Sequence, residues 1–315
     1  MRYINEIKAD ERVTDHFMCK DKQSLKSRNG KTYFSLKLQD KTGTIDAKVW
    51  DLTKDIQSFE KNDVIKIDGT SLSYQNDIQI KVVKIRKSED GEYDPTDLIP
   101  ATKENIDEMY NKFISYIDTI SNDKVKEMLL NIFVHDSVIS QAIKTHSAAK
   151  SMHHNYLGGL LEHTLGIVEI CNFLANQYSS VNRDVLIASA MLHDVGKVYE
   201  LSSFPENDYT DIGQLLGHLI IGIELVTYES KKIESFPKEY KNLIKHCLVA
   251  HHGELEYGSP KKPATLEAYL LHMADNIDAK SKMYLTAIEN DSTNAKWVGY
   301  DRVLGTNIRR SIENE

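Results

Sequence analysis

The apolar residues of this 315-residue chain change their period once, close to residue 90, and that change limits the folds open to it. Before it, apolar and polar residues alternate, as in KTYFSLKLQD and DIQIKVVKIRK. Such alternation is typical of strands with one buried face. After residue 102, apolar residues recur about every 3.6 positions, as in amphipathic helices. We therefore predict an all-β domain followed by an all-α domain.

The segment between the two patterns is acidic and holds two prolines without any apolar period. Its sequence, SEDGEYDPTDLIPAT, is typical of a linker or of a strap between domains. We expect the β domain at residues 1–87, the linker at 88–102, the helical domain at 103–290 and a tail at 291–315. Helices are predicted at 103–120, 122–134, 136–149, 157–178, 183–196, 213–229, 238–251 and 265–290.

The alternating pattern of residues 16–86 predicts five short strands and one short helix near LTKDIQSF, residues 52–59. This pattern favours a closed Greek-key barrel of the oligonucleotide-binding (OB) kind, with another small antiparallel barrel or sandwich left open. Aromatic residues interleaved with lysines suit single-stranded nucleic acid, because bases stack on the rings and phosphates meet the charges. Alternation sends Tyr33 and Phe34 to opposite faces, so about half of the aromatic rings are expected in the core. The predicted nucleic-acid contacts are Tyr33, Phe34, Trp50, Lys31, Lys37 and Lys48, with Tyr74 as a further candidate.

Charge is distributed unevenly along the chain. Residues 1–90 hold 18 Lys and Arg against 15 Asp and Glu, whereas the rest of the chain holds 21 against 32. An acidic domain binds a polyanion poorly unless bound metal ions supply positive charge. The chain has no apolar stretch near the roughly 18 residues of a membrane span, and its N-terminus is charged throughout. We therefore expect a cytoplasmic protein that does not bind membranes.

Eleven of the twelve histidines lie between residues 135 and 272, inside the predicted helical domain. Burying several imidazoles and carboxylates without partners is costly, and a shared cation removes that cost. Mixed imidazole and carboxylate ligands favour manganese, iron, cobalt or zinc over calcium. Five apolar helical stretches carry such polar residues: GGLLEHTLGIV, MLHDVGK, LLGHLIIGIE, LVAHHGE and LLHMADNIDAK. These stretches predict one shared metal centre.

The order H…HD…H…H…D resembles the HD-domain metal-dependent phosphohydrolases over roughly residues 150–285. That resemblance implies an all-helical fold with two divalent ions, manganese first, while cobalt, iron, magnesium, zinc and nickel stay open. The implied ligands of the first ion are His163, His193, Asp194 and Asp275. The implied ligands of the second ion are Asp194, His218 and His251, with His252 left open as a ligand or a substrate contact.

The order of an OB-like domain and an HD domain is similar to the YhaM-type 3′–5′ exoribonuclease family over nearly the full length, including the tail KWVGYDRVLGTNI. This resemblance implies a homo-oligomeric hydrolase that shortens single-stranded RNA from its 3′ end, with single-stranded DNA open as a second substrate. The alternatives are an HD nucleotidase or cyclic-nucleotide phosphodiesterase with a regulatory barrel, a di-iron oxidase, and a non-catalytic nucleic-acid adaptor.

The expected chemistry is attack on phosphorus by a water that the ions activate. Asp194 is predicted to hold that water, Lys197 to meet a phosphate oxygen, and His252 to contact the substrate. For Lys197, a helix-terminal cation in solvent is the alternative. Asp278 and Lys280 follow Asp275 closely and are candidates for orienting ligands. Further candidate substrate contacts are His153, His154, Tyr300 and Arg302.

Overall fold

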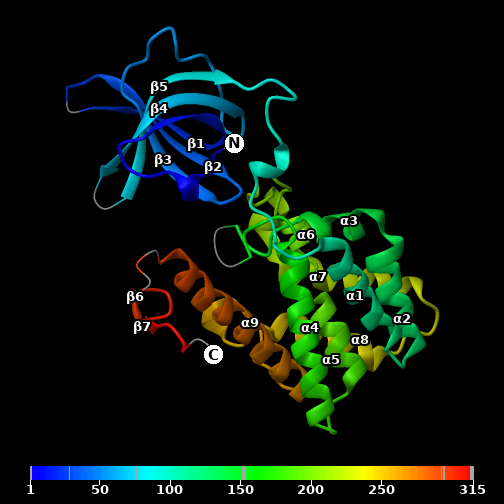
Figure 1. The fold of residues 1–315 in the computed structure, drawn as a ribbon. Coiled ribbons are helices and arrows are strands. Elements are labelled where there is room, and N and C mark those ends of the chain that lie inside the picture. The colour runs from blue at the N-terminus through cyan, green and yellow to red at the C-terminus, as the bar shows by residue number, and fades with distance from the viewer. Residues whose placement is uncertain are drawn as a thin grey trace. The chain divides into compact units, whose positions relative to one another are not determined.

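The computed structural model describes residues 2–27, 29–74, 77–150, 154–291, 293 and 295–312 (Figure 1). The chain divides into two compact units, Met1–Ala101 with Phe204–Glu206, and Thr102–Ser203 with Asn207–Glu315. The first unit is built around a closed barrel and the second is mainly helical. This arrangement confirms the predicted order of an all-β domain and an all-α domain. None of the described helices has the length and apolar character that crossing a membrane requires.

The barrel closes in the strand order β1–β2–β3–β5–β4. Neighbouring strands are antiparallel, except that β3 and β5 are parallel. The first strand closes the barrel because it pairs with β4 through its first half and with β2 through its second half, across a bulge between Cys19 and Asp21. The strands are β1 (Arg12–Lys26), β2 (Thr32–Asp40), β3 (Gly43–Val49), β4 (Val64–Tyr74) and β5 (Asp77–Lys87).

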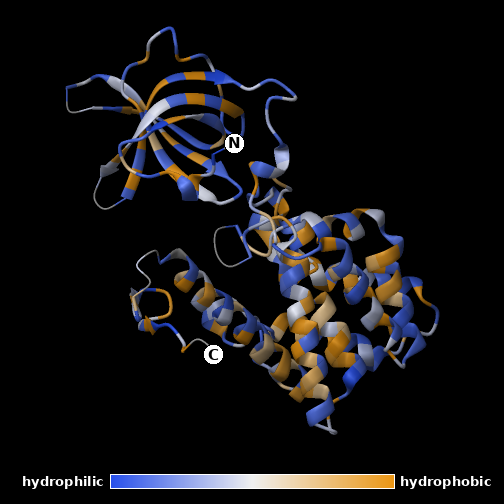
Figure 2. Ribbon diagram, viewed as in Figure 1, coloured by the Kyte–Doolittle hydropathy of each residue, from blue (hydrophilic) through white to orange (hydrophobic). Residues whose placement is uncertain are grey.

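The core of the barrel is formed by every second residue of each strand, and Figure 2 shows the resulting alternation of hydropathy along the strands. Fully buried side chains include Phe17, Leu38, Ile65 and Ile80. At the bulge between β4 and β5, a Cβ on Gly69 would lie 2.6 Å from the carbonyl oxygen of Lys81. Glycine therefore lets the two strands approach closely at this point.

Residues 52–59 do not form the predicted helix. Ile56 pairs with Ile85 in an isolated parallel bridge, and the amide of Gln57 donates to the carbonyl of Ile85. The segment continues to Phe59, which is fully buried in the barrel. Extended pairing with β5 satisfies the backbone and places Phe59 in the core, so tertiary contacts override the local pattern.

Residues 88–101 belong to the same unit as the barrel and form a strap along it. Leu98 is fully buried, and its carbonyl accepts a hydrogen bond from the Gln39 side chain. Asp97, in the 3₁₀ turn η2 (Pro95–Asp97), forms an ion pair with Lys41 at 2.7 Å. The strap is therefore held by both apolar burial and charge.

The helical unit is built around α5 (Arg183–Leu192), in which every residue from Asp184 to Leu192 is buried. This helix packs against α2, α4, α8 and α9, as a helix that is apolar on all sides must. Each predicted helical range contains a helix. The other helices are α1 (Ile106–Asp118), α2 (Asp123–Leu130), α3 (Ser137–Thr145), α4 (Gly159–Gln177), α6 (Lys197–Glu200), α7 (Asp211–Lys232), α8 (Lys238–Ala250) and α9 (Leu266–Asn290), with a π-helical turn at η3 (Asn131–His135).

Two features of this unit were not predicted. Helix α7 is kinked at Gly217, whose φ of 72° and ψ of 160° favour glycine and place the break one residue before His218. The tail forms a hairpin of β6 (Trp297–Asp301) and β7 (Thr306–Arg309), with Ile308 buried. The hairpin packs against α9.

Candidate metal centre

All the predicted ligands come together within the helical unit. They lie on, or directly after, helices α4, α5, α7, α8 and α9. His163 lies on α4, the His193–Asp194 pair follows α5, and His218 follows the kink of α7. The remaining residues are His251 and His252 at the end of α8 and Asp275 on α9. Because α5 is the buried central helix, the residues that follow it are buried too, with His193 1% and Asp194 2% exposed.

The first group of donor atoms surrounds Asp194 Oδ2. This oxygen lies 3.4 Å from His163 Nε2 and 3.3 Å from His193 Nε2. His163 Nε2 is also 3.4 Å from His193 Nε2 and 3.4 Å from Asp275 Oδ1. Two donors that each lie about 2.1 Å from one ion are about 3.4 Å apart at a tetrahedral angle. The spacing of this group therefore fits a shared cation.

The second group surrounds the other oxygen of the same carboxylate. Asp194 Oδ1 lies 3.5 Å from His218 Nε2 and 3.8 Å from His251 Nε2, and His218 Nε2 is 3.3 Å from His252 Nε2. Oδ1 is buried and has no hydrogen-bond partner among the described residues. A buried acceptor without a partner is destabilising, and a cation among these atoms would satisfy it. Both His251 and His252 thus face this group.

Each imidazole of the cluster is oriented by its second nitrogen. A carbonyl or carboxylate oxygen can only accept, so Nδ1 carries the proton and Nε2 presents its lone pair to the cluster. This is the tautomer that a metal ligand needs. The Nδ1 acceptors are Asp278 Oδ2 for His163 (2.7 Å), Ala190 O for His193 (2.8 Å), Glu200 Oε1 for His218 (3.0 Å), Leu248 O for His251 (2.7 Å) and Tyr257 O for His252 (3.0 Å).

Electrostatics keep the donor set in forms suited to a cation. Burial raises the pKa of Asp194, but Lys197 and His193 outweigh burial and hold that pKa well below its usual range. Burial and the neighbouring His193 lower the pKa of His251 well below its usual value, so this imidazole is neutral. Burial also disfavours a charge on His163, but hydrogen bonds with carboxylates outweigh it and raise the pKa to about 9. A cation at His163 therefore displaces a proton.

Glu200 is a part of the centre that sequence analysis missed. Its Oε1 accepts from both the backbone amide and Nδ1 of His218, each at 3.0 Å. The kink at Gly217 leaves that amide without its helical partner, and the carboxylate replaces it. Glu200 is buried on the short helix α6. Its local sequence, KVYELSS, carries no signal of this role, because the contact depends on the fold of α6 against α7.

The variant Glu200→Gln is expected to lower metal affinity by about 10- to 100-fold, the usual cost of losing a group that orients a ligand. Glutamine keeps the size of the side chain and one acceptor oxygen but removes the negative charge beside the His218 imidazole. Metal titration measures the effect. Glu229→Gln, at another buried glutamate that pairs with Lys232 on α7, is the matched control. Equal metal affinity in the two variants would contradict this role for Glu200.

His154, a predicted substrate contact, lies behind the cluster. It is 3% exposed, and its Nε2 lies 3.0 Å from Asp278 Oδ2, the oxygen that also binds His163 Nδ1. Its own Nδ1 lies 2.9 Å from the Tyr156 hydroxyl. His154, His163 and Asp278 could hold a metal ion by spacing. However, His163 would then need both nitrogens deprotonated, so the contacts fit hydrogen bonds that orient Asp278. His153 lies outside the described residues.

The other predicted substrate contacts differ in position. Lys197 is close to the cluster, with Nζ 2.7 Å from Asp194 Oδ2. Tyr300 lies on β6 and is 64% exposed, and Arg302 follows it in the exposed turn. No hydrogen bond or ion pair joins either side chain to the cluster within the part of the chain that the structure describes. Their predicted role remains untested.

The barrel carries the predicted aromatic contacts on the outer face of β2 and β3. Tyr33 and Trp50 are stacked, with ring centroids 4.5 Å apart and an interplanar angle of 24°, and Trp50 is 40% exposed. Lys37 and Lys48 are outward residues of the same two strands, and Lys48 donates to Ser35. Lys31 is engaged in an ion pair with Asp51.

Phe34 is the exception among the predicted contacts. It points to the inner face with Leu36 and Leu38, packs against the barrel core and meets Phe59 edge to face at 6.3 Å. A partly buried ring in this position stabilises the barrel, and its role as a nucleic-acid contact stays a prediction.

Comparison with known proteins agrees with both units. Residues 160–280 match the family model of the HD domain, and residues 18–87 match the family model described as an OB-fold nucleic acid binding domain. Over 288 residues the chain is 32% identical to the 3′-5′ exoribonuclease YhaM of Geobacillus sp. (strain WCH70), which covers 91% of this chain and 88% of that protein. The chain belongs to the YhaM family. All predicted metal ligands of this YhaM family member, from His163 to Asp275, lie within the residues that match the HD-domain model.

Two solved structures also match part of this YhaM family member. The second OB-fold domain of replication protein A from Methanococcus maripaludis is 22% identical, covers 29% of this chain and 96% of its own, and gives a TM-score of 0.24. A replication protein A heterotrimer bound to ssDNA is 21% identical, covers 28% of this chain and 64% of its own, and gives a TM-score of 0.22.

Proposed function

We propose that the chain is a metal-dependent 3′–5′ exoribonuclease that hydrolyses phosphodiester bonds of single-stranded RNA from the 3′ end. The observation that carries the proposal is the carboxylate of Asp194, which presents one oxygen to each of two groups of imidazoles in a member of the YhaM family. Paired cations held in this way suit hydrolysis of a phosphodiester. We propose manganese as the metal, which fits the mixed imidazole and carboxylate donors.

In this proposal His163, His193, Asp194 and Asp275 hold one ion, and Asp194, His218, His251 and His252 hold the other. Bound divalent ions lower the pKa of water and neutralise charge on the phosphate. The residues around them do the positioning. The oxygens that accept from each Nδ1 keep the imidazoles pointed inward, and Lys197 adds a fixed positive charge for the phosphate.

A labelled-RNA assay tests the proposal directly. The protein is stripped with a chelator, supplied with Mn²⁺ or Mg²⁺, and incubated with single-stranded RNA labelled at its 5′ end. We expect a descending ladder that depends on the metal. Intact RNA beside hydrolysed mononucleotides would instead favour the nucleotidase, the second candidate. A parallel reaction with single-stranded DNA measures whether DNA is also a substrate, and sedimentation measures the self-association that we propose.

The stacked pair of Tyr33 and Trp50 is proposed to hold bases of the strand. Trp50→Ala is expected to weaken RNA binding by about 1–3 kcal/mol, the usual contribution of one base stacked on an aromatic ring. Hydrolysis of a small phosphodiester should not change, because that substrate needs only the metal centre. Tyr178→Ala, which removes a ring of similar exposure from the helical unit, is the control. Equal RNA affinity in the two variants would contradict the stacking role.

A further inference from the structure

The outer face of β1, β4 and β5 carries rows of charged and polar side chains. Strand register places outward side chains side by side in three rows, which are His16, Lys66 and Arg86; Thr14, Asp68 and Lys84; and Arg12, Thr70 and Lys81. Lys54, outside these rows, lines the same hollow as Lys66 and Lys84. We name Arg12, Lys54, Lys66, Lys81, Lys84 and Arg86 the basic face. Asp68 is the acidic residue within the three rows.

Existing ion pairs leave part of this positive charge unbalanced. Asp68 accepts two hydrogen bonds from Arg12, and Arg86 is paired with Glu92 of the strap. Lys66 and Lys84 have no ion-pair partner among the residues that the structure describes. Lys66 lies directly opposite Arg86, whose charge Glu92 already balances. An anionic ligand would balance the charges of Lys66 and Lys84.

A cavity of about 290 Å³ opens on the basic face. Its lining combines cations, polar groups and apolar atoms, from Thr14, Lys54, Asp55, Gln57, Lys66, Ile67, Asp68, Lys84, Ile85 and Arg86. Such a surface offers both charge and a shallow floor to a phosphate-bearing chain.

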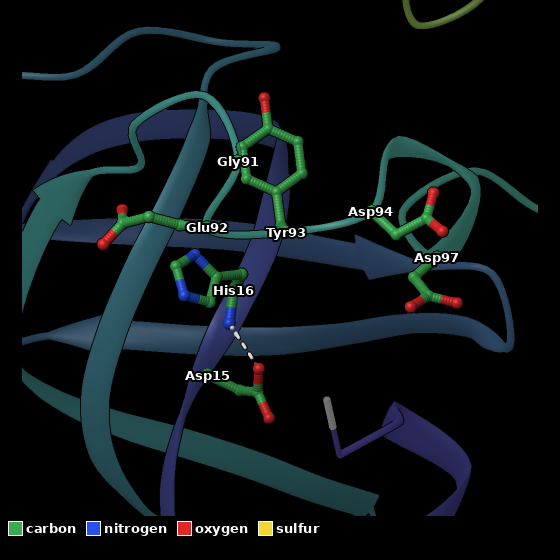
Figure 3. Close-up of a pocket in the computed structure, with 7 residues that line it drawn as sticks. All are labelled: Asp15, His16, Gly91, Glu92, Tyr93, Asp94 and Asp97. Atoms are coloured by element: carbon green, nitrogen blue, oxygen red, sulfur yellow. Dashed lines mark hydrogen bonds between the residues drawn. The ribbon is translucent and has the colours of Figure 1, made fainter.

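The hollow on the strap side of β1 is a contrasting case (Figure 3). Its lining carboxylates are those of Asp15, Glu92, Asp94 and Asp97, and each has a hydrogen-bond or ion-pair partner. Asp15 accepts from the backbone amides of Arg2 and His16, while Glu92 and Asp97 pair with Arg86 and Lys41. The ion pairs of Glu92 and Asp97 hold the strap to the barrel, and the acidic lining of this hollow does not suit a phosphate.

We name the outer surface around Tyr33 and Trp50 the aromatic face. Strand pairing connects the basic face to this aromatic face. Lys48 of β3 is the direct partner of Lys81 on β5, Lys81 is the partner of Thr70 on β4, and Thr70 is the partner of Arg12. Neighbouring strands lie about 4.8 Å apart, so this row carries cations from one face of the barrel to the next. A strand whose bases stack on Tyr33 and Trp50 can continue along it.

We propose that the basic face binds the phosphate backbone of the same RNA strand, after that strand has passed from the aromatic face across Lys48 and Lys81. The inference rests on the proposed exoribonuclease function. It assigns sequence-independent affinity to β1, β4 and β5, whereas base stacking stays with β2 and β3. Only a strand long enough to reach both faces uses the second contact.

The test compares the full-length protein with Lys66→Gln/Lys84→Gln, using oligouridylate strands of about 5 and about 20 nucleotides, chosen around the span of one OB fold. Binding is measured over a range of salt concentrations with chelator present, so that hydrolysis does not interfere. For the long strand, the slope of log affinity against log salt should become shallower by about 1.4, because each lost contact removes about 0.7. The short strand should bind with unchanged slope.

Lys231→Gln/Lys238→Gln is the control, because it removes the same charge from exposed lysines of the helical unit. An unchanged slope for the long strand in the Lys66→Gln/Lys84→Gln protein would overturn the inference. An equal change for both strand lengths would overturn the path across the two faces. A change in sedimentation with unchanged RNA binding would assign the face to contacts between copies instead. The ladder assay with the wild-type protein tests the proposed function separately. If the protein binds RNA in a salt-dependent manner but does not cleave it, only the proposed exoribonuclease function is contradicted.

Discussion

Asp194→Asn is expected to lower RNA hydrolysis at least about a thousandfold, which corresponds to about 4 kcal/mol of lost transition-state stabilisation. The wild-type carboxylate faces one group of imidazoles with each oxygen. An asparagine of the same shape has one oxygen and one amide nitrogen that cannot donate a lone pair. It therefore serves one group at most, and it also leaves the partly buried ammonium of Lys197 without its carboxylate.

Two quantities are measured for Asp194→Asn: the rate of RNA shortening and the number of metal ions bound per chain. The second is informative even if the chain is inactive for another reason. Asp184→Asn is the matched control, because Asp184 is a buried aspartate at the other end of α5. Its carboxylate accepts from the backbone amides of Ser121 and Asn122. Asp184→Asn should therefore cost about 1–3 kcal/mol of stability and leave metal binding intact.

The proposal fails if Asp194→Asn binds as much metal as the control and shortens RNA within about tenfold of the wild-type rate, since tenfold is only about 1.4 kcal/mol. A loss of metal in both variants would indicate a general failure to fold. Thermal unfolding of the metal-free proteins separates that case.

The residues of the cluster could be predicted from sequence because each one interrupts an apolar helical stretch, and because their order is typical of HD domains. The groups that orient them could not. Glu200 acts on His218 across 18 positions, through a kink that depends on Gly217. Likewise, His154 and His163 meet on Asp278 over separations of 124 and 115 positions. Contacts of that range are a property of the packed helices.

The barrel shows a different limit of sequence reasoning. Alternation predicted that Tyr33 and Phe34 face opposite ways, and the parity of Leu36 and Leu38 indicates that Phe34 is the inward one. The alternation of β2 therefore places Phe34 on the inner side of the barrel. The predicted helix at residues 52–59 failed for another reason, since its local pattern is ambiguous and a bridge to Ile85 decides it.

Gly196→Ala is expected to lower hydrolysis by about a hundredfold, the cost of displacing a catalytic group by about 1 Å. A Cβ on Gly196 would lie 2.1 Å from the carbonyl oxygen of His218 and 2.8 Å from its Cα. Both are backbone atoms, so the added methyl must push α6 and α7 apart. The backbone of Gly196 is in the ordinary helical region, so space and not conformation is the obstacle.

The displacement acts on one group of donors. His218 belongs to the second group, whereas His163 and His193 come from α4 and from the end of α5. We therefore expect Gly196→Ala to lose affinity for one of two ions and to keep the other, with stability reduced by about 1–3 kcal/mol through overpacking. A metal titration fitted with two binding steps measures the affinity for each ion. Thermal unfolding measures the change in stability.

Gly222→Ala is the control for Gly196→Ala. Gly222 is a buried glycine of α7, and the nearest atom to its added Cβ is a Leu248 side-chain carbon at 3.4 Å, an ordinary contact. It should therefore keep both ions and nearly full activity. If Gly196→Ala instead keeps both ions and wild-type activity, the close approach of α6 to His218 does not set the geometry of the second group. If it loses both ions together, the two groups behave as one site joined through Asp194.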